Sequence, residues 1–234
     1  MQKPQLLLTR PLGMNAEFAA RFPKDLAHRL QFIDCPLIRI VSLQGQNGLE
    51  GDAQAIFTSS NGVRFAPPSL GRLAYCVGER TTEAARNAGW FSVHAGKNAV
   101  ELIEYIAARD PKESLYHLCG KHQRGNVVEA LIAKGMRAKR VVLYDQQLLP
   151  VPAGVLDSLK RDTPTIVPLF SPRGAAHFAG QVPESPRATV IAMSDAVAKA
   201  VRSTSDLKTV TCAHPTANAM LEAIENLTLA HRLG

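Results

Sequence analysis

Short polar side chains follow an apolar run near residue 58, and their types suit the binding of an anion. Residues Thr58–Asn61 come directly after the run Ala53–Phe57, and Gly62 follows them. Such side chains cap helices because their oxygens accept hydrogen bonds from free backbone N–H groups, and glycine lets the chain turn closely. A strand that enters a helix through this turn leaves N–H donors directed at one place. The segment therefore predicts an anion site at the start of a helix.

The same pattern of residue types occurs again in the second half of the chain. Leu169–Phe178 repeats the Phe, the Ser and the small residues of Ile56–Phe65. Each copy is followed by another strand-to-turn-to-helix pattern, at Tyr75–Ala84 and at Ile191–Ala198. Two matched pairs indicate two similar domains, each with a polar rim, and a ligand held between such rims would be large and acidic. The alternative is that each segment is only a well-capped turn between a strand and a helix.

Length and charge restrict the class of protein. The chain has 234 residues, which fits two domains, and its formal net charge of +7 attracts polyanions without saying which one. Nucleic acid is not indicated, because aromatic residues are only 6% and the basic cluster Lys134–Arg140 lacks any accompanying nucleic-acid-binding motif. We interpret that cluster as a solvated helix end. A small polycarboxylate or a phosphate fits the charge equally well.

The spacing of the cysteines and histidines, together with the shortness of the apolar stretches, predicts a cytoplasmic protein without disulfides or bound metal. The four cysteines are far apart, with no C-x-x-C pair, and Cys76 and Cys119 lie in apolar runs typical of buried thiols. No signal peptide is indicated at the N-terminus, and no apolar stretch approaches the ~18 residues that span a membrane. The scattered histidines form no metal set and are assigned no role: His28, His94, His117, His177, His214 and His231.

Strand patterns alternate with helix patterns along the whole chain, which favours parallel sheets covered by helices on both faces. We therefore expect an α/β fold of two flavodoxin-like or Rossmann-like lobes with a cleft between them. The second half is one strand–helix unit short of a complete sheet, and the first strand, from Gln5 to Thr9, would supply it. Ligands of such sheets bind beyond the carboxyl ends of the strands, where the polar turns lie. The expected domains are 1–37 with 149–234 and, inserted between them, 38–148, joined by two extended crossover strands near Pro36–Val41 and Tyr144–Pro152.

Helical spacing of apolar residues predicts which faces of two helices are buried. In the segment Asn98–Arg109, the residues expected to face the core are Val100, Ile103, Ile106 and Ala107. The last helix is expected to bury a stripe of apolar residues between Ala219 and Leu227.

The ordered set of short motifs resembles the uroporphyrinogen-III synthase family. Each motif alone is weak, but together they follow the family's order over nearly the whole chain. They are Leu7–Pro11, Ile56–Val63, Val77–Thr82, Leu118–Gly125, Val142–Tyr144, Leu169–Pro172 and Pro215–Thr216. The resemblance implies two α/β lobes joined by two strands, with the substrate held between the lobes.

The resemblance also implies the reaction, which is that of a cyclising lyase in heme and tetrapyrrole biosynthesis. The substrate, hydroxymethylbilane, is a linear tetrapyrrole with eight carboxylates. It loses its terminal hydroxyl as water, closes into a ring and inverts its last pyrrole, and no cofactor or metal is needed. In water it closes by itself to the wrong isomer, so the enzyme must select a conformation. The implied enzyme is a monomer, and the preceding enzyme, hydroxymethylbilane synthase, is a possible partner.

Tyr144 resembles the family's cleft tyrosine, which the resemblance places next to the substrate. A phenol of ordinary pKa is protonated at pH 7 and can donate a proton to the leaving hydroxyl. The alternative is a tyrosine that only anchors a strand end. Lys121, His122 and Arg124 are either further carboxylate contacts or solvated surface residues. The resemblance assigns substrate binding to Thr58, Ser59, Asn61, Gly78 and Thr81 in one lobe, and to Arg10, Ser171, Pro172, Arg173 and Ser194 in the other.

One segment departs from the family's pattern. Where the family has a Gly-x-Thr-Thr-like turn, this chain has Ser194-Asp195-Ala196-Val197. Asp195 either caps the helix and faces away, or alters the site by placing a negative charge near an acidic ligand. The departure favours a second hypothesis, a non-catalytic two-lobed protein that binds an acidic small molecule. A third, a nucleotide- or flavin-binding module, is disfavoured because neither glycine-rich phosphate motif is present.

Overall fold

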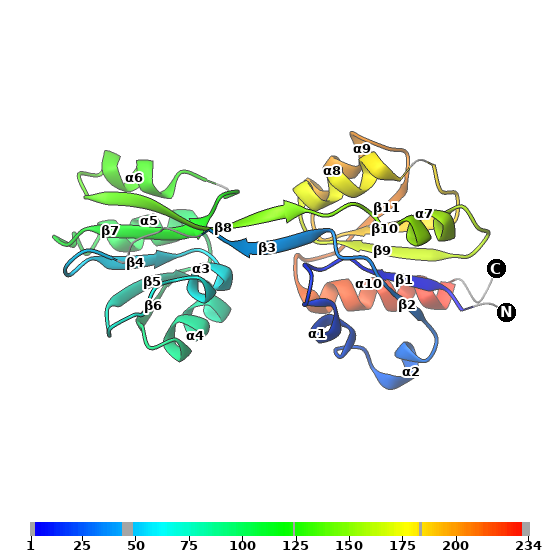
Figure 1. The fold of residues 1–234 in the computed structure, drawn as a ribbon, viewed down its shortest axis with the longest axis horizontal. Helices are drawn as coiled ribbons and strands as arrows, with labels where there is room; N and C mark the ends of the chain where they lie inside the picture. Colours follow the sequence, from blue (N-terminus) through cyan, green and yellow to red (C-terminus); the bar gives the residue numbers. More distant parts are fainter. Residues whose placement is uncertain (1–2, 44–48, 124, 183, 231–234) are drawn as a thin grey trace. The chain divides into compact units, whose positions relative to one another are not determined.

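The computed structural model describes residues 3–43, 49–123, 125–182 and 184–230. The chain divides into two compact units: unit 1 comprises Met1–Arg39 and Gln147–Gly234, and unit 2 comprises Ile40–Gln146. The chain therefore begins in unit 1, builds unit 2 and returns. Each unit is a sheet with helices on both faces (Figure 1). The predicted fold class, two α/β lobes with parallel sheets, is confirmed.

Unit 1 contains a five-stranded sheet in the order β11-β10-β9-β1-β2. Its strands are β1 (Gln5–Leu8), β2 (Gln31–Asp34), β9 (Thr165–Leu169), β10 (Ala188–Ala192) and β11 (Lys208–Thr211). All four neighbouring pairs are parallel. Gln5 of β1 pairs with Thr165 of β9, so the first strand of the chain completes the sheet of the second half, as predicted.

Helices cover both faces of this sheet and bury separate clusters (Figure 1). They are α1 (Asn15–Ala19), α2 (Lys24–Ala27), α7 (Ala153–Leu159), α8 (Pro172–Gln181), α9 (Asp195–Arg202) and α10 (Ala217–Ala230). Helices α7, α8 and α9 pack on one face, where Phe178 is fully buried. Helices α1, α2 and α10 pack on the other, where Met220 and Ile224 are fully buried. This two-sided burial explains why β9 and β10 are mostly apolar and buried at every residue.

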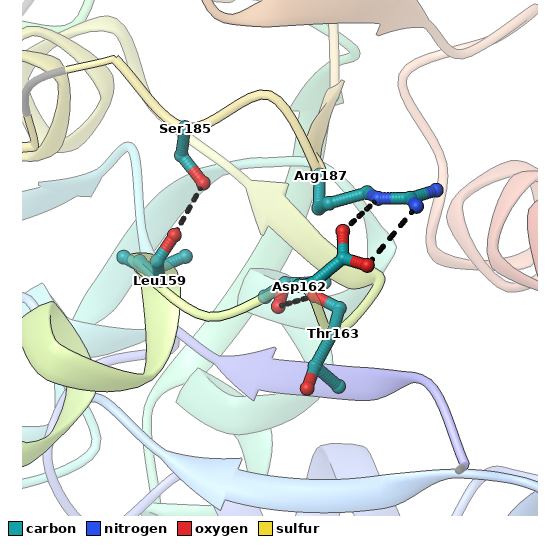
Figure 2. Close-up of polar contacts among 6 residues, drawn as sticks. Leu159, Asp162, Thr163, Ser185 and Arg187 are labelled. Carbon is teal, nitrogen blue, oxygen red and sulfur yellow. Dashed lines mark hydrogen bonds and ion pairs between the residues drawn. The ribbon is translucent and has the colours of Figure 1, made fainter.

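Side chains just before β9 and β10 tie the amino ends of these strands together (Figure 2). The guanidinium of Arg187 donates to both carboxylate oxygens of Asp162, at 2.5 and 3.3 Å, and the Ser185 hydroxyl donates to the Leu159 carbonyl at 2.8 Å. The hydrogen bond and the charge of Arg187 hold the pKa of the Asp162 carboxyl below its ordinary value. Both charged groups are exposed, so the pair contributes little stability. These contacts lie at the sheet edge opposite the polar turns.

Unit 2 contains a six-stranded sheet in the order β3-β8-β7-β4-β5-β6. Its strands are β3 (Ile38–Ser42), β4 (Gln54–Phe57), β5 (Leu73–Val77), β6 (Phe91–Gly96), β7 (Leu115–Gly120) and β8 (Ala138–Leu148). Within this order, the neighbouring strands β8-β7-β4-β5-β6 all pair in parallel. The strand expected around Tyr144 is β8, which runs for 11 residues. Strands β3 and β8 contain the two points where the chain passes between the units.

Four helices cover the sheet of unit 2: α3 (Ser60–Arg64), α4 (Glu79–Asn87), α5 (Ala99–Ala107) and α6 (Val127–Ala133). Helices α3 and α4 share one cluster with Phe57 and Trp90, whose rings meet edge to face at 5.1 Å. Helices α5 and α6 cover the other face with Ile106 and Leu131. Burying large side chains on both faces supplies most of the stabilisation of such a sheet.

The predicted inner face of α5 is wrong at one position. Val100 is 64% exposed, whereas Leu102 and Ile106 are fully buried. Leu102 and Ile106 are four residues apart and share a helix face, but Val100 precedes Leu102 by two residues, about 200° around the axis. Asn98 caps the helix by accepting from the N–H groups of Val100 and Glu101, each at 3.0 Å. The cap places Val100 in the first turn, on the solvent side.

All four cysteines are buried and free, as predicted for Cys76 and Cys119. Burial raises the pKa of the Cys35 and Cys76 thiols to about 12, so these thiols are unreactive. Within the described part of the chain, no helix is both long and apolar enough to cross a bilayer.

Candidate functional site

The first polar turn of unit 2 joins β4 to α3 at the carboxyl edge of the sheet. Ser59 is extended and precedes α3, and its Oγ accepts a hydrogen bond from the Gly62 N–H at 3.3 Å. A Cβ at Gly62 would lie 2.5 Å from the carbonyl oxygen of Leu118 in β7. Glycine therefore allows α3 to pack directly against β7. Asn61, also predicted to bind substrate, is half-buried in the first turn of α3.

Tyr144 lies beside this turn. Its hydroxyl is 3.1 Å from Ser59 Oγ, and either group can be the donor. Only 4% of the Tyr144 side chain is exposed, and Phe65 stacks on its ring at a centroid distance of 5.4 Å. Burial raises the pKa of the Tyr144 phenol above its ordinary value, and the Ser59 hydrogen bond lowers it by less. The phenol therefore keeps its proton at neutral pH. The structure thus brings together two residues that the sequence assigned to the site.

Gly120 makes room for the Tyr144 ring. The register of β7 and β8 shifts between Cys119 and Gly120, which places Gly120 opposite Tyr144. A Cβ at position 120 would lie 2.6 Å from Cε2 and 2.7 Å from Cζ of Tyr144. The guanidinium of Arg140 donates to the carbonyls of Gly120 and Lys121, at 3.1 and 2.8 Å, and holds this backbone. Any side chain at position 120 would have to displace the phenol.

Thr58, next to Ser59, contacts a different strand. Its Oγ1 is 3.0 Å from Nε2 of His117 in β7, and His117 is 1% exposed. Burial and, to a lesser extent, the positive charge of Arg140 lower the pKa of the His117 imidazole to about 4, against a smaller opposite effect of Glu129. His117 is therefore neutral at pH 7. Two adjacent hydroxyl groups of one turn are thus bound by side chains of β7 and β8.

The second turn of unit 2 joins β5 to α4. Gly78 precedes the helix with a φ of 76°, and its N–H donates to the Gly96 carbonyl at 2.9 Å. Thr81 is 7% exposed, and the Thr82 hydroxyl donates to the Gly78 carbonyl at 2.9 Å. The Thr81 side chain therefore faces the interior, away from solvent. The backbone of this turn is better placed than the Thr81 hydroxyl to meet a ligand.

The loop after β7 carries the basic residues that the sequence left as possible carboxylate contacts. Lys121 Nζ lies 3.6 Å from an Asp145 carboxylate oxygen, and His122 Nε2 lies 3.2 Å from the other. Both residues are therefore next to a carboxylate of the protein itself. Arg124 lies outside the described residues.

In unit 1, the matching turn joins β9 to α8. Ser171 precedes α8, and its Oγ accepts from the Gly174 N–H at 3.1 Å. Pro172 is the first residue of α8, and Arg173, which is half-buried, is the second. The Arg10 guanidinium, just after β1, lies over the Phe170 ring at 4.7 Å. Because β1 and β9 are neighbours in the sheet, these predicted site residues share one edge.

The departure at Ser194–Val197 follows β10, the next strand in the sheet. Ser194 occupies the N-cap position of α9, but its side chain makes no capping hydrogen bond. Asp195 is exposed in the first turn of α9. The interpretation that Asp195 caps the helix is wrong, because Ser194 occupies the capping position. A carboxylate in the first turn of a helix is nevertheless favourable for the helix dipole.

Comparison with known proteins identifies a family whose model covers most of the chain. Residues 26–222 match the family described as uroporphyrinogen-III synthase HemD. This chain belongs to the uroporphyrinogen-III synthase family. Members of this family are cyclising lyases that act on hydroxymethylbilane in tetrapyrrole synthesis, so the predicted enzyme class and function are confirmed. The alternative of a non-catalytic binding protein is not favoured.

Two solved structures show the same fold at low sequence identity. Uroporphyrinogen-III synthetase from Helicobacter pylori is 16% identical, with a TM-score of 0.68, and the alignment covers 97% of this chain and 100% of that one. A mutant uroporphyrinogen III synthase from Thermus thermophilus is 15% identical, with a TM-score of 0.57, covering 97% and 99%. No curated protein matches this chain in a sequence comparison.

Sequence reasoning missed three residues that position the site. His117 was grouped with histidines without a role, and neither Gly120 nor Phe65 was singled out. The signal for His117 was its place in an otherwise apolar strand, where a polar side chain needs a partner. Among the residues that the structure describes, no group of three or more His, Cys, Asp or Glu side chains is arranged to hold a metal ion.

Proposed function

We propose that this chain converts hydroxymethylbilane into uroporphyrinogen III with the Tyr144 phenol as proton donor. The phenol gives its proton to the terminal hydroxyl, the carbon–oxygen bond breaks, and water leaves. Ring closure with inversion of the last pyrrole then releases a proton from a pyrrole carbon, and that proton restores the phenol. The 3.1 Å contact between the Tyr144 hydroxyl and Ser59 Oγ is the observation that carries this proposal.

Burial and hydrogen bonding suit Tyr144 to this role. Its raised pKa keeps the proton on the phenol until the leaving hydroxyl takes it. The Ser59 hydroxyl can then donate to the phenolate, and a hydrogen bond to a charged oxygen is stronger than one to a neutral oxygen. The Phe65 ring and the close approach of Gly120 hold the phenol in one orientation. A fixed donor needs little reorganisation during the reaction.

We propose that the substrate carboxylates are bound by donors of the polar turns in both units. In unit 2 these turns contain Thr58, Ser59, Asn61, Gly78 and Thr81, and in unit 1 Arg10, Ser171, Pro172, Arg173 and Ser194. Helix N-termini bind anions through free N–H groups, so eight carboxylates do not require eight arginines. For Thr81 the contact comes from the backbone of its turn, because the side chain faces inward. The net charge of +7 attracts the polyanion over longer distances.

Binding of both substrate ends is the source of the isomer selectivity. A flexible chain whose ends are held together reacts as an intramolecular system, which lowers the entropic part of the barrier. We further propose that the enzyme acts as a cytoplasmic monomer that receives its unstable substrate from hydroxymethylbilane synthase. The domain boundaries proposed from sequence, 1–37 with 149–234 and 38–148, remain our proposal for the functional lobes.

The direct test is conversion of enzymatically made hydroxymethylbilane, with the product isomers separated. Wild-type protein should yield the type III isomer. Tyr144→Phe should lower kcat for that isomer by about 100-fold or more, because a general acid contributes a factor of this size. The stacking on Phe65 is kept, so the fold should persist in circular dichroism.

Tyr116→Phe is the matched control. Tyr116 is also buried in unit 2, and its hydroxyl donates to Glu50 at 3.2 Å. Its substitution removes one hydrogen bond of a buried tyrosine away from the polar turns, and the rate should stay near that of wild type. Type I product alone from the wild-type protein would end the proposed function. Equal rates for the Tyr144 and Tyr116 variants would end the role of Tyr144.

A further inference from the structure

His117 has two ring nitrogens in different surroundings. Nε2 lies 3.0 Å from Thr58 Oγ1. Nδ1 is buried and makes no hydrogen bond to any described residue. The ring lies in β7, where its neighbours in register are Ile56 of β4 and Arg140 of β8. The direction of the Nε2 hydrogen bond therefore depends on which nitrogen carries the proton.

The buried Nδ1 decides between the two neutral forms. A neutral imidazole has one N–H group and one acceptor nitrogen. A proton on Nδ1 would leave a buried N–H without an acceptor, and such orphaned donors are rare and costly in folded proteins. A proton on Nε2 leaves only an unpaired acceptor at Nδ1, which is better tolerated, and it lets Nε2–H donate to Thr58. The low pKa of about 4 excludes the doubly protonated ring at neutral pH.

We propose that His117 is a positioning residue that directs the Thr58 hydroxyl proton toward a substrate carboxylate. Thr58 Oγ1 accepts from His117 Nε2, so its own hydrogen remains available for another acceptor. With the opposite tautomer, Thr58 would donate to the imidazole and present only lone pairs to the ligand. A carboxylate accepts hydrogen bonds and does not donate them, so only the first arrangement binds it. This inference rests on the proposed function, in which Thr58 binds substrate.

The arrangement also explains why a histidine occupies this buried strand position. Burial and the positive charge of Arg140 keep His117 neutral, and the lack of a described partner at Nδ1 keeps the proton on Nε2. The orientation of the Thr58 hydroxyl is therefore set before substrate binds. A donor fixed in advance loses less conformational freedom on binding than one that must rotate into place.

The first experiment measures the tautomer in the full wild-type chain. Nitrogen-15 shifts of the histidine rings, recorded at neutral pH, distinguish an Nε2–H from an Nδ1–H imidazole. The His117 signals are those that disappear in His117→Gln. We expect a neutral ring with its proton on Nε2. A proton on Nδ1, or a charged ring, would overturn the inference whatever the enzyme activity.

The second experiment measures steady-state kinetics with hydroxymethylbilane. His117→Phe fills the space but cannot donate, so KM should rise about tenfold with kcat nearly unchanged, as expected when a contact that is equal in ground and transition states is lost. His117→Gln places an amide donor near the Nε2 position and should restore most of the affinity. His94→Gln, at an exposed histidine of β6, is the matched control and should behave as wild type.

A double-mutant cycle links His117 to Thr58. Thr58→Val removes the hydroxyl and should raise KM about as much as His117→Phe. In the Thr58→Val background, His117→Phe should add little, because both changes remove the same contact. Additive effects would overturn the positioning role, as would failure of glutamine to rescue. Wild-type synthesis of the type III isomer together with an unchanged KM in His117→Phe would refute this inference and leave the proposed function standing.

Discussion

The two turns that begin α3 and α8 share a backbone design but differ in their side-chain partners. In each, a serine precedes the helix and accepts from a glycine N–H three residues later, Ser59 from Gly62 and Ser171 from Gly174. In unit 2, Ser59 also contacts Tyr144, and the preceding Thr58 contacts His117. In unit 1, the residue before the serine is Phe170, which has no polar group and lies under the Arg10 guanidinium.

This difference separates two functions of the capped turn, which are the binding of an anion and the movement or orientation of a proton. The capped turn alone offers backbone N–H groups to an anion, and both units have it. The turn of unit 2 adds Tyr144 and His117, side chains from the sheet that can move or orient a proton. We therefore propose that the chemical step takes place at unit 2 and that the turn of unit 1 only binds substrate. Three predictions test this division.

The largest expected effect is a pH dependence of stability that comes from His117. The unfolded imidazole takes up a proton near pH 6.5, whereas burial lowers the folded pKa to about 4. Between these values the unfolded state binds more protons, so the free energy of unfolding falls as the pH falls from 6.5 to 4. The loss should be about 3 kcal/mol; it is absent well above pH 6.5 and complete below about pH 4, so His117 contributes a slope only between these two values. Urea unfolding at a series of pH values measures it.

His117→Gln should remove this part of the slope, and His94→Gln should retain it. His94 is an exposed histidine of β6, so His94→Gln makes the same substitution outside the buried strand. The comparison concerns the slopes of the variants, because the substitutions also change absolute stability. An unchanged slope in His117→Gln would show that the buried imidazole does not titrate as proposed. The contact of Thr58 with His117 would then no longer support the contrast between the two turns.

The second prediction concerns the two equivalent glycines. A Cβ at Gly62 would lie 2.5 Å from the backbone oxygen of Leu118, which cannot move without disturbing β7. At Gly174 the closest contact would be Ser171 Oγ at 3.2 Å, followed by Ile38 Cδ1 at 3.9 Å. Gly62→Ala should therefore lower the free energy of unfolding by about 2 kcal/mol. Gly174→Ala should change it by less than about 1 kcal/mol, because alanine favours the helix and offsets the tighter contact.

Denaturant unfolding of the two variants side by side measures this difference. At Gly62 a Cβ would clash with the backbone of β7, whereas at Gly174 it would meet a side chain at 3.2 Å. Equal losses in the free energy of unfolding for the two variants would therefore contradict the comparison. Each variant serves as the control for the other, because both replace a buried glycine near a helix start by alanine.

Local patterns predicted most of the fold, because the information lies in short segments. The fully buried β9 and β10 and the helix α8 between them follow directly from strand and helix spacing. The membership of β1 in the sheet of the second half followed from counting strand–helix units, but its pairing with β9 was not predicted. The four-residue α2 and the full length of β8 did not, because a single helical turn has no periodicity and the ends of β8 are polar. Val100 was misplaced because its side of α5 depends on the Asn98 cap.

The candidate site was predictable only where its residues are adjacent in sequence. The serine turns were found because hydroxyl-rich segments next to glycine are visible locally. The contacts of Tyr144 with Ser59 and of Thr58 with His117 join residues far apart in the chain, so no local pattern reveals them. Gly120 opposes Tyr144 only because the register of β7 and β8 shifts there, which depends on the assembled sheet. The inward direction of Thr81 likewise follows from how α4 packs.

A smaller change in stability than that of Gly62→Ala, and the sharpest test of the division, is expected from Ser59→Ala and Ser171→Ala. Each removes one capping acceptor and should lower the free energy of unfolding by about 1 kcal/mol. Only Ser59→Ala should also lower kcat for the type III isomer, by about tenfold, because it removes the donor to the Tyr144 phenolate. Ser171→Ala should raise KM and leave kcat unchanged, since its turn only binds substrate. Equal losses of kcat in the two variants would mean that both turns take part in the chemical step, and the contrast drawn from their side-chain partners would then be wrong.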